Sequence, residues 1–488
     1  MKTLRWAIAS SLVGALFAGT AMAQVTMSSP VLQPSSIQQM AFQSDDSVGY
    51  AVADSAPAGA AVALASPSNQ PSVAAKVEVK PAAEAFRQSC DTQCESQCGK
   101  PAEEGQYKLF HGPRMDCNHL DIRGFFDVGW TGNPAYPVNR LNGPVGYNDR
   151  SNEVDLNQFY LIAERIAKVE GDCGVDFGYR TDVMYGTDRR FVQAAKGTNW
   201  DSNFNNGNRF YGLAAPQAYG DLAINKLLLR GGHFYAPCGF EVPNADGNFF
   251  YSHTYGFLYG MPTTLTGGYA TYKVNDKLSV NAGLDTGWNE FESLNGKVNA
   301  MLGFNWTSEG GKINVTSEGF IGNTQAPGIT SDRATFVTDI NVKLGCKWRY
   351  VLENTLGHDT NTSSTNNQTV GGIGFVPVEG TGPSSWFGLT NYLLYDINDC
   401  WGFGVRYEYF EDLDGAAVAP VDTGVREPGT KWNDVTIGLN WKPNKNVTVR
   451  SEVRWDWAAN SSATGFKPFD DGQKNSQCLW GNDVVIRF

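Results

Sequence analysis

The residues best suited to act on ions in this sequence are charged side chains that recur at every second position. In VTVRSEVRWDW, the charged residues Arg450, Glu452, Arg454 and Asp456 alternate with other, mostly apolar residues. Successive side chains of a strand point to opposite faces, so one face carries the charges and the other carries valine and tryptophan. A row of fixed charges can attract, repel and orient solutes that pass it. The pattern therefore predicts strands with water on one side and lipid on the other.

The same alternation recurs from about Asp121 to the last residue, Phe488, for example in VDFGYRTDVMY. We assign these basic residues to the inner face of a barrel: Arg123, Arg180, Lys312, Lys343, Arg349, Arg406, Arg450, Arg454 and Arg487. We assign these acidic residues to the same face: Asp127, Asp176, Asp182, Asp285, Glu318, Asp339, Glu353, Glu408, Glu452, Asp456 and Asp483. The two signs nearly balance, so we expect weak ion selectivity. The alternative is that most of these charges only solvate the wall and pair across strands.

A second candidate site is the segment 237–263, the third long connection between predicted strands. Its aromatic residues would form a large exposed apolar patch on a free loop. They are Phe249, Phe250, Tyr251, Tyr255, Phe257 and Tyr259. We therefore expect the segment to fold into the barrel and narrow it, with Phe250 and Tyr255 at the constriction. Glu241 and Asp246 would then face inner-wall arginines such as Arg180, Arg450 and Arg454, while Arg406 also lines the pore.

Two other interpretations of 237–263 remain open. Part of the segment could form an extra pair of strands, which would make eighteen strands instead of sixteen. The aromatic row could also form a stacking track for sugars, although the segment has no ladder of tryptophans.

The third candidate is a stripe of thiols. The sequence has nine cysteines, and Cys90, Cys94 and Cys98 recur every fourth residue, on one side of a predicted short helix. We expect these residues or Cys117 to form disulfides that tie the helix to a neighbouring subunit or to the barrel floor, which carries Cys173, Cys346 and Cys400. A metal site that includes Cys117 and His119 is the alternative, but the spacing differs from that of structural zinc sites. A third possibility is an unpaired stripe that packs as small hydrophobic side chains.

Enzyme chemistry has little support in the sequence. There is no G-x-S-x-G motif and no H-E-x-x-H motif. The pair of glycines around Ile373 lacks the strand and helix that a nucleotide site requires. We therefore predict that the chain is not an enzyme and needs no cofactor and no metal.

The elements that position these residues follow from composition and from turn signals. Residues 1–23 have the charged start, the short apolar stretch and the Ala-x-Ala end of a signal peptide. Residues 24–83 are rich in Ala, Ser and Pro and predict a disordered periplasmic tether. Residues 84–118 predict the short cysteine-rich helix and a connection, and residues 119–488 predict the barrel. The net charge of −12 disfavours nucleic acid as a partner.

Short polar turns and long connections alternate along the barrel region. The predicted short turns are 170–172, 225–226, 275–277, 308–311, 345–347, 398–400 and 443–446. The predicted long connections are 131–153, 188–215, 237–263, 289–297, 323–333, 359–385, 412–431 and 458–476. Together they predict sixteen antiparallel strands, and a barrel of that size encloses an aqueous lumen.

Residues 119–488 resemble the OmpL-like "putative beta-barrel porin" family of bacteria. The resemblance rests on the segment GHFYAPCGFEVPNADGNFFYSHTYGFLYGMPTTLTGGY (232–269) and on the C-terminal DVVIRF. It implies an outer-membrane porin fold and brings no catalytic or binding residues, because the substrates of the family are poorly defined. In general porins the loop after the fifth strand narrows the barrel, and here the fifth strand is predicted to end near Ala236. The cysteine-rich region 84–117 lies outside the resemblance.

The sequence as a whole predicts a transmembrane antiparallel β-barrel in the bacterial outer membrane. Its expected function is passive diffusion of small hydrophilic solutes and ions. The expected partners are outer-membrane lipid, these solutes, two further copies in a homotrimer, and the barrel-assembly machinery, which would read the C-terminal strand and its final Phe488. The alternatives are a structural or adhesive barrel with a plugged lumen and a sugar-selective channel.

Overall fold

The computed structural model of the chain describes residues 107–488, apart from 111, 113–114, 116–118, 171–173, 195–198, 206–209, 294–295, 327–328, 361–381, 416, 419–428 and 460–466. The predicted signal peptide and tether lie outside the described residues. So do Cys90, Cys94, Cys98, Cys117 and Cys173, and with them the predicted helix and its disulfides.

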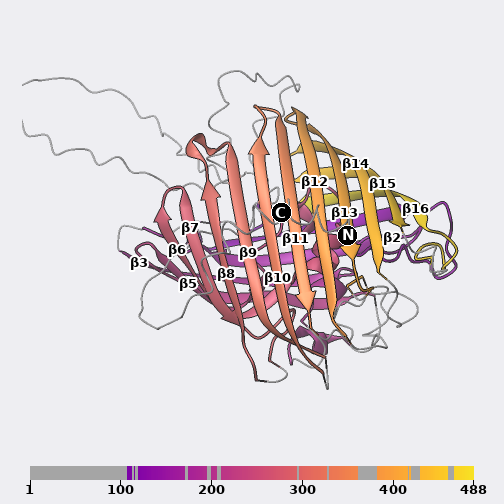
Figure 1. Cartoon of the computed structure of the whole chain (residues 1–488). Helices are drawn as coiled ribbons and strands as arrows, with labels where there is room; N and C mark the ends of the chain where they lie inside the picture. The colour runs from indigo at the N-terminus through magenta and orange to yellow at the C-terminus, as the bar shows by residue number, and fades with distance from the viewer. Residues whose placement is uncertain are drawn as a thin grey trace, which may run out of the picture. The chain divides into compact units, whose positions relative to one another are not determined.

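Sixteen strands form a closed antiparallel barrel in which each strand pairs with its neighbours in the sequence. Figure 1 shows the strands side by side around the barrel. The strands of the first half are β1 Asp121–Gly132, β2 Val154–Arg165, β3 Val175–Gly186, β4 Gly212–Ile224, β5 Leu227–Tyr235, β6 Thr264–Asn275, β7 Leu278–Asp285 and β8 Asn299–Thr307. Those of the second half are β9 Ile313–Ala326, β10 Ile329–Lys343, β11 Trp348–Asp359, β12 Ser384–Asn398, β13 Trp401–Asp412, β14 Thr430–Asn444, β15 Val447–Ala459 and β16 Ser476–Arg487. The predicted barrel of sixteen strands is confirmed.

Helices are few and short. They are α4 Arg189–Val192, η1 Asp201–Phe204, η2 Ala245–Gly247, the π-helical turn η3 Gly256–Gly260, and η4 Glu309–Gly311. In the part of the chain that the structure describes, no helix has the length and apolar character needed to cross a membrane.

Burial along the strands is the reverse of that in a water-soluble protein. In β15, the side chains of Arg454 and Asp456 are fully buried, while Val453 and Trp455 are 50% and 56% exposed. Charged residues are almost never buried without partners, so the charged face must be the lined interior of the barrel. The apolar face points outward, where lipid replaces water. The face assignment predicted from the two-residue alternation therefore holds in this strand.

Three details of the predicted strands change. The long connection expected at 323–333 is instead part of a hairpin. Strand β9 extends to Ala326, β10 begins at Ile329, and the two strands pair along that length. Lys312, predicted to line the wall, lies in the turn before β9 and is exposed. Eighteen strands are excluded, since no strand lies between the end of β5 and the start of β6, a segment that the structure describes completely.

The barrel closes by pairing the first strand with the last, β1 with β16. Phe488 continues this seam beyond β16, because its backbone exchanges two hydrogen bonds of 2.9 Å with Gly124. The Phe488 ring packs on Phe126 and Phe159, with centroids 5.4 Å and 6.4 Å away. The final residue therefore contributes both backbone and ring contacts to the seam.

Removal of Phe488 should weaken the seam more than truncation of its ring. We expect Phe488→Ala to lower the free energy of unfolding by about 1 kcal/mol, the scale of an aromatic pair. Deletion of the residue should lower it by a further ~2 kcal/mol, since two backbone hydrogen bonds are lost as well. Urea unfolding of the refolded barrel in lipid vesicles measures both values. Equal values for the two variants would contradict a role for the backbone bonds.

Candidate functional site

The connection between β5 and β6 folds back inside the barrel; we call residues 236–263 the inner loop. It has two short helical turns, η2 and η3, and no strand. All its phenylalanine and tyrosine side chains are at least 94% buried, and its Tyr255 and Tyr259 are buried almost completely. The loop has no hydrogen-bonded ladder of its own, so its backbone polar groups need partners from the wall.

Glutamates of the wall accept hydrogen bonds from the N–H groups of the inner loop. Glu353 on β11 accepts from Phe240 N at 2.7 Å. Glu408 on β13 accepts from the N–H groups of Tyr255 and Gly256, both at 2.7 Å. Glu452 on β15 accepts from the N–H groups of Tyr251 and Ser252, at 2.9 and 3.0 Å. A carboxylate that accepts backbone N–H bonds makes charge-assisted bonds, which are stronger than neutral ones.

Arginines of the wall donate to the carbonyl groups of the same loop. Arg450 donates to Ala245 O at 2.7 Å and to Asn248 O at 2.9 Å. Arg406 donates to Ser252 O at 2.6 Å, and Arg454 donates to His253 O. Strands β13 and β15 thus bind both polar groups of the loop backbone.

The arginine charges are balanced by acids on neighbouring strand positions. Arg454 pairs with Asp456 at 2.7 Å, and Arg450 pairs with Asp483 of β16 through Nε at 2.9 Å. Arg406 lies 3.5 Å from Asp434 of β14. Buried ion pairs of this kind hold only when nearly all their hydrogen-bonding groups are satisfied.

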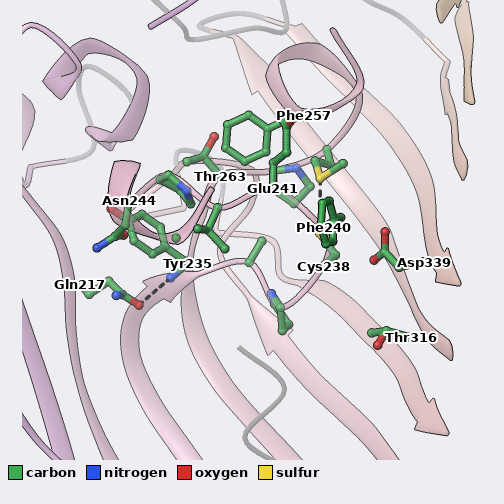
Figure 2. Close-up of a pocket in the computed structure, with 18 of the residues that line it drawn as sticks. Gln217, Tyr235, Cys238, Phe240, Glu241, Asn244, Phe257, Thr263, Thr316 and Asp339 are labelled. Carbon is green, nitrogen blue, oxygen red and sulfur yellow. Dashed lines mark hydrogen bonds between the residues drawn. The ribbon is translucent and has the colours of Figure 1, made fainter. Parts of the chain in front are cut away.

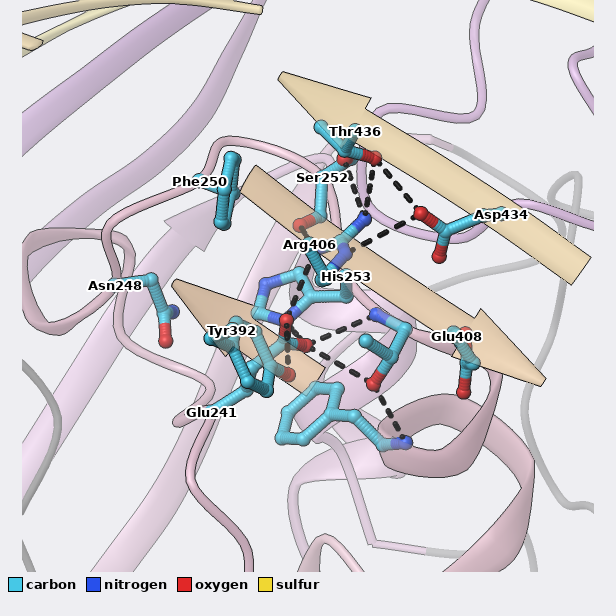
Figure 3. Close-up of polar contacts among 12 residues, drawn as sticks. Glu241, Asn248, Phe250, Ser252, His253, Tyr392, Arg406, Glu408, Asp434 and Thr436 are labelled. Carbon is cyan, nitrogen blue, oxygen red and sulfur yellow. Dashed lines mark hydrogen bonds and ion pairs between the residues drawn. The ribbon is translucent and has the colours of Figure 1, made fainter. Parts of the chain in front are cut away.

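Glu241 of the inner loop binds both the wall and the loop itself, as Figure 3 shows. Its carboxylate accepts from Arg406 at 2.9 Å, from Tyr392 at 3.1 Å and from the Thr254 N–H at 2.9 Å. His253 lies 3.1 Å away on the loop itself. Burial alone would raise the pKa of Glu241, but Arg406 and these hydrogen bonds hold the pKa at about 2.

A cavity remains between the inner loop and the opposite part of the wall (Figure 2). The space in which the centre of a water molecule can move is about 70 Å³. Strand residues line it together with the start and the end of the loop; the strand residues are Arg123, Ile162, Arg180, Gln217, Tyr235, Asn314, Thr316, Asp339 and Asn341. The loop therefore binds β11 to β16 and β2, and leaves open space towards β3, β9 and β10.

The structure gives other partners to the loop acids than the sequence suggested. Glu241 pairs with Arg406, and Asp246 lies 3.6 Å from Arg487. Arg180 does not reach either acid, because it pairs with Asp182 at 2.7 Å and with Glu164 at 3.2 Å. Phe250 and Tyr255 are buried against the wall, and Tyr255 donates to Asp456 at 2.8 Å.

A second layer of loops was not predicted from the sequence. Tyr147, from the connection 133–153, packs against His253 of the inner loop, with ring centroids 4.2 Å apart and the rings tilted by 40°. Tyr259 donates to Pro144 O at 2.6 Å. Arg190 of α4 ties this layer together through two bonds to Asp149, at 2.7 and 2.8 Å. The apolar residues Val145 and Tyr147 were the available sequence signal, because a free polar loop would not need them.

Four of the nine cysteines lie in the part of the chain that the structure describes: Cys238, Cys346, Cys400 and Cys478. Cys346 lies in the β10–β11 turn and Cys400 in the β12–β13 turn. Cys238 is on the inner loop, where its sulfur lies 3.9 Å from that of Met261. In the described ranges, no group of three or more His, Cys, Asp or Glu side chains has the geometry of a metal site.

Comparisons place the barrel among known proteins. The family model described as putative beta-barrel porin-2, OmpL-like, matches residues 119–488. No curated protein matches the sequence. The chain is similar to the outer membrane channel DcaP of Acinetobacter baumannii, with 12% identity, a TM-score of 0.48, and coverage of 76% of this chain and 97% of that chain. It is also similar to an anion-selective porin from Comamonas acidovorans, with 10% identity, a TM-score of 0.47, and coverage of 76% and 99%. Both TM-scores are under 0.5.

Loss of Arg406 should loosen the inner loop. Arg406→Met leaves Glu241 without its arginine and Asp434 with Arg454 alone, a loss on the scale of about 3–5 kcal/mol for a broken buried pair. We expect faster proteolysis within residues 236–263, read by mass spectrometry of the fragments. Arg165→Met is the matched control, because Arg165 pairs with Asp176 of β3 at 2.8 Å and not with the loop. Equal cleavage of both variants would contradict this role of Arg406.

Acid should release the same contact. The pKa of Glu241 is about 2 in the folded barrel, against an ordinary value of 4.5. A lowered pKa contributes stability that is present above pH 4.5 and is lost as the pH falls towards 2, about 3 kcal/mol in total. We expect the Thr254 amide to lose protection from hydrogen exchange over this range, after correction for the intrinsic rate. In Glu241→Gln, protection should be low and should lack this pH dependence.

Proposed function

The chain belongs to the putative beta-barrel porin-2, OmpL-like family, and on that premise we propose that it is a passive diffusion channel for small hydrophilic solutes and ions. It is a porin-like barrel of the bacterial outer membrane. In the proposed function the inner loop narrows the lumen, and solutes cross down their own gradients without a chemical step.

The observation that carries this proposal is the one-sided attachment of the inner loop. The backbone of the loop is bonded to Glu353, Arg406, Glu408, Arg450 and Glu452 on β11 to β15. It is also bonded to Arg487 on β16 and to Gln158 on β2, and with β1 these strands form one continuous part of the wall. A loop held against one part of the wall reduces the cross-section of a wide barrel without filling it. The remaining cavity is lined by polar side chains on β9 and β10, among them Thr316 and Asn341, which suits hydrophilic solutes.

One observation favours a second candidate, a structural barrel with a plugged lumen. The loop layer around Val145, Tyr147 and Phe191 is also almost completely buried against the inner loop. If that layer and the N-terminal segment together close the lumen, the barrel would be an anchor rather than a channel. The sugar-selective channel, in contrast, needs exposed aromatic faces in the path, and Phe250 and Tyr255 are buried in the wall contact instead.

Three parts of the sequence interpretation stay predictions. They are the signal peptide with its tether at 24–83, the recognition of the Phe488 strand by the assembly machinery, and the homotrimer. The mass of the native protein in detergent tests the trimer directly.

Single-channel recording in a planar bilayer tests the channel itself. We expect large, ohmic current steps from the mature protein and from a variant that lacks residues 24–118, since the loop leaves the cavity open in both. Current only after truncation would make the N-terminal segment a plug. Folded protein without current in either form would favour the structural barrel.

The narrowing role of the inner loop has its own test. Arg450→Met removes three donor contacts to loop carbonyls, at 2.7, 2.9 and 3.1 Å, and should let the loop move away from β15. We expect a higher or noisier single-channel conductance than in Arg165→Met, which removes a similar guanidinium away from the loop. An unchanged conductance in Arg450→Met would contradict the narrowing.

A further inference from the structure

Most charges that line the cavity already have an opposite charge beside them. Arg180 pairs with Asp182 and Glu164, and Arg123 also pairs with Glu164. On the loop side, Glu241 pairs with Arg406 and Asp246 lies 3.6 Å from Arg487. A paired charge acts on a passing ion as a dipole, so its influence falls off quickly with distance.

Asp339 is different. It lies on β10 and lines the cavity, with its side chain next to Cys238 and Phe240 of the inner loop (Figure 2). Its cross-strand neighbour on β11 is another acid, Glu353, and the two carboxyl groups make a hydrogen-bonding contact. Within the described ranges neither acid has an ion pair with a lysine, arginine or histidine.

The oxygen atoms around Asp339 are also unsatisfied. Asp339 is only 8% exposed, and its Oδ1 has no hydrogen-bond partner. Asn341 lies two residues further along the same face and is only 7% exposed. Its Oδ1 atom also has no hydrogen-bond partner. Buried oxygens in native proteins nearly always have a partner, so these two acceptors on one cavity wall are available to a ligand. Both atoms are acceptors, and the ligand must therefore carry positive charge or donor hydrogens.

Glu353 cannot serve this ligand freely, because its Oε2 already accepts the Phe240 N–H at 2.7 Å. Its hydrogen bond with Asp339 requires one proton between the two carboxyl groups, so the pair carries a single negative charge, on Asp339. Glu318 on β9 adds a further acid to the same part of the wall, and its Oε1 is buried without a partner.

We propose that Asp339, with Asn341 beside it, is a binding site for small cations on the cavity wall and gives the channel a preference for cations. The proposal rests on the diffusion function proposed above. The near balance of charged residues in the sequence predicts weak selectivity, but internal pairing removes most of those charges from the balance. The charge that remains unpaired on the cavity wall is negative.

The test is the reversal potential of the full mature protein in a planar bilayer under a KCl gradient. We expect the wild type to favour K⁺ over Cl⁻. Asp339→Asn keeps the shape and an acceptor for the Glu353 contact but removes the charge, and should lower the permeability ratio by about fivefold, the effect of one charge ~4 Å away in water. Asp339→Arg is the second variant and should shift the preference towards Cl⁻.

Asp276→Asn is the matched control. It makes the same charge change in the β6–β7 turn, where the Asp276 side chain is 90% exposed and pairs with Lys273. We expect its reversal potential to equal that of the wild type. A wild type without K⁺ preference, or equal reversal potentials in wild type and both Asp339 variants, would overturn the cation site while the current itself upholds the channel. Absence of current in every folded variant would overturn the channel and the site together.

Discussion

The need to satisfy backbone polar groups inside a closed barrel determines much of this structure. The inner loop lies in the lumen without a ladder of its own, so its N–H and C=O groups would be buried without partners. Glu353, Glu408 and Glu452 accept from the N–H groups, and Arg406, Arg450 and Arg454 donate to the carbonyls. Charged side chains of the strands therefore do for this loop what a neighbouring strand does in a sheet.

This arrangement also explains why so many charges are tolerated in the barrel. An isolated buried charge is very unfavourable, and most of the wall charges here are paired or bound to the loop backbone. Outside, the requirement is reversed, because lipid accepts valine and tryptophan but not arginine. The two-residue alternation of the strands meets both requirements with one pattern, as in β15.

That pattern is why much of the fold could be predicted from the sequence. Alternation gave the inward position of Arg454 and Asp456, and short polar turns such as 225–226 gave the strand count. The aromatic content of 237–263 indicated a loop that packs against the wall. The β9–β10 connection differs from the prediction, because polar residues in a long hairpin resemble a loop when neither face is strongly apolar.

The pairing inside the site could not be predicted in the same way. Glu241 and Arg406 are 165 residues apart, and they meet only because barrel closure and strand stagger bring β13 opposite the inner loop. The same holds for Asp339 and Glu353, whose neighbourhood depends on the register of β10 with β11. Periodicity assigns a residue to a face of the sheet; it does not say which residue it meets there.

The distribution of the loop contacts has a consequence for engineering. The inner loop comes from the middle of the chain, while Arg406, Arg450 and Glu452, which hold it, come from strands near the end. The loop and the wall residues that bind it are therefore encoded by separate parts of the sequence, and the two parts must be complementary. If residues 236–263 were transplanted into another barrel, the loop would lose the wall side chains that fix its conformation. A graft must therefore carry the β13 and β15 side chains as well.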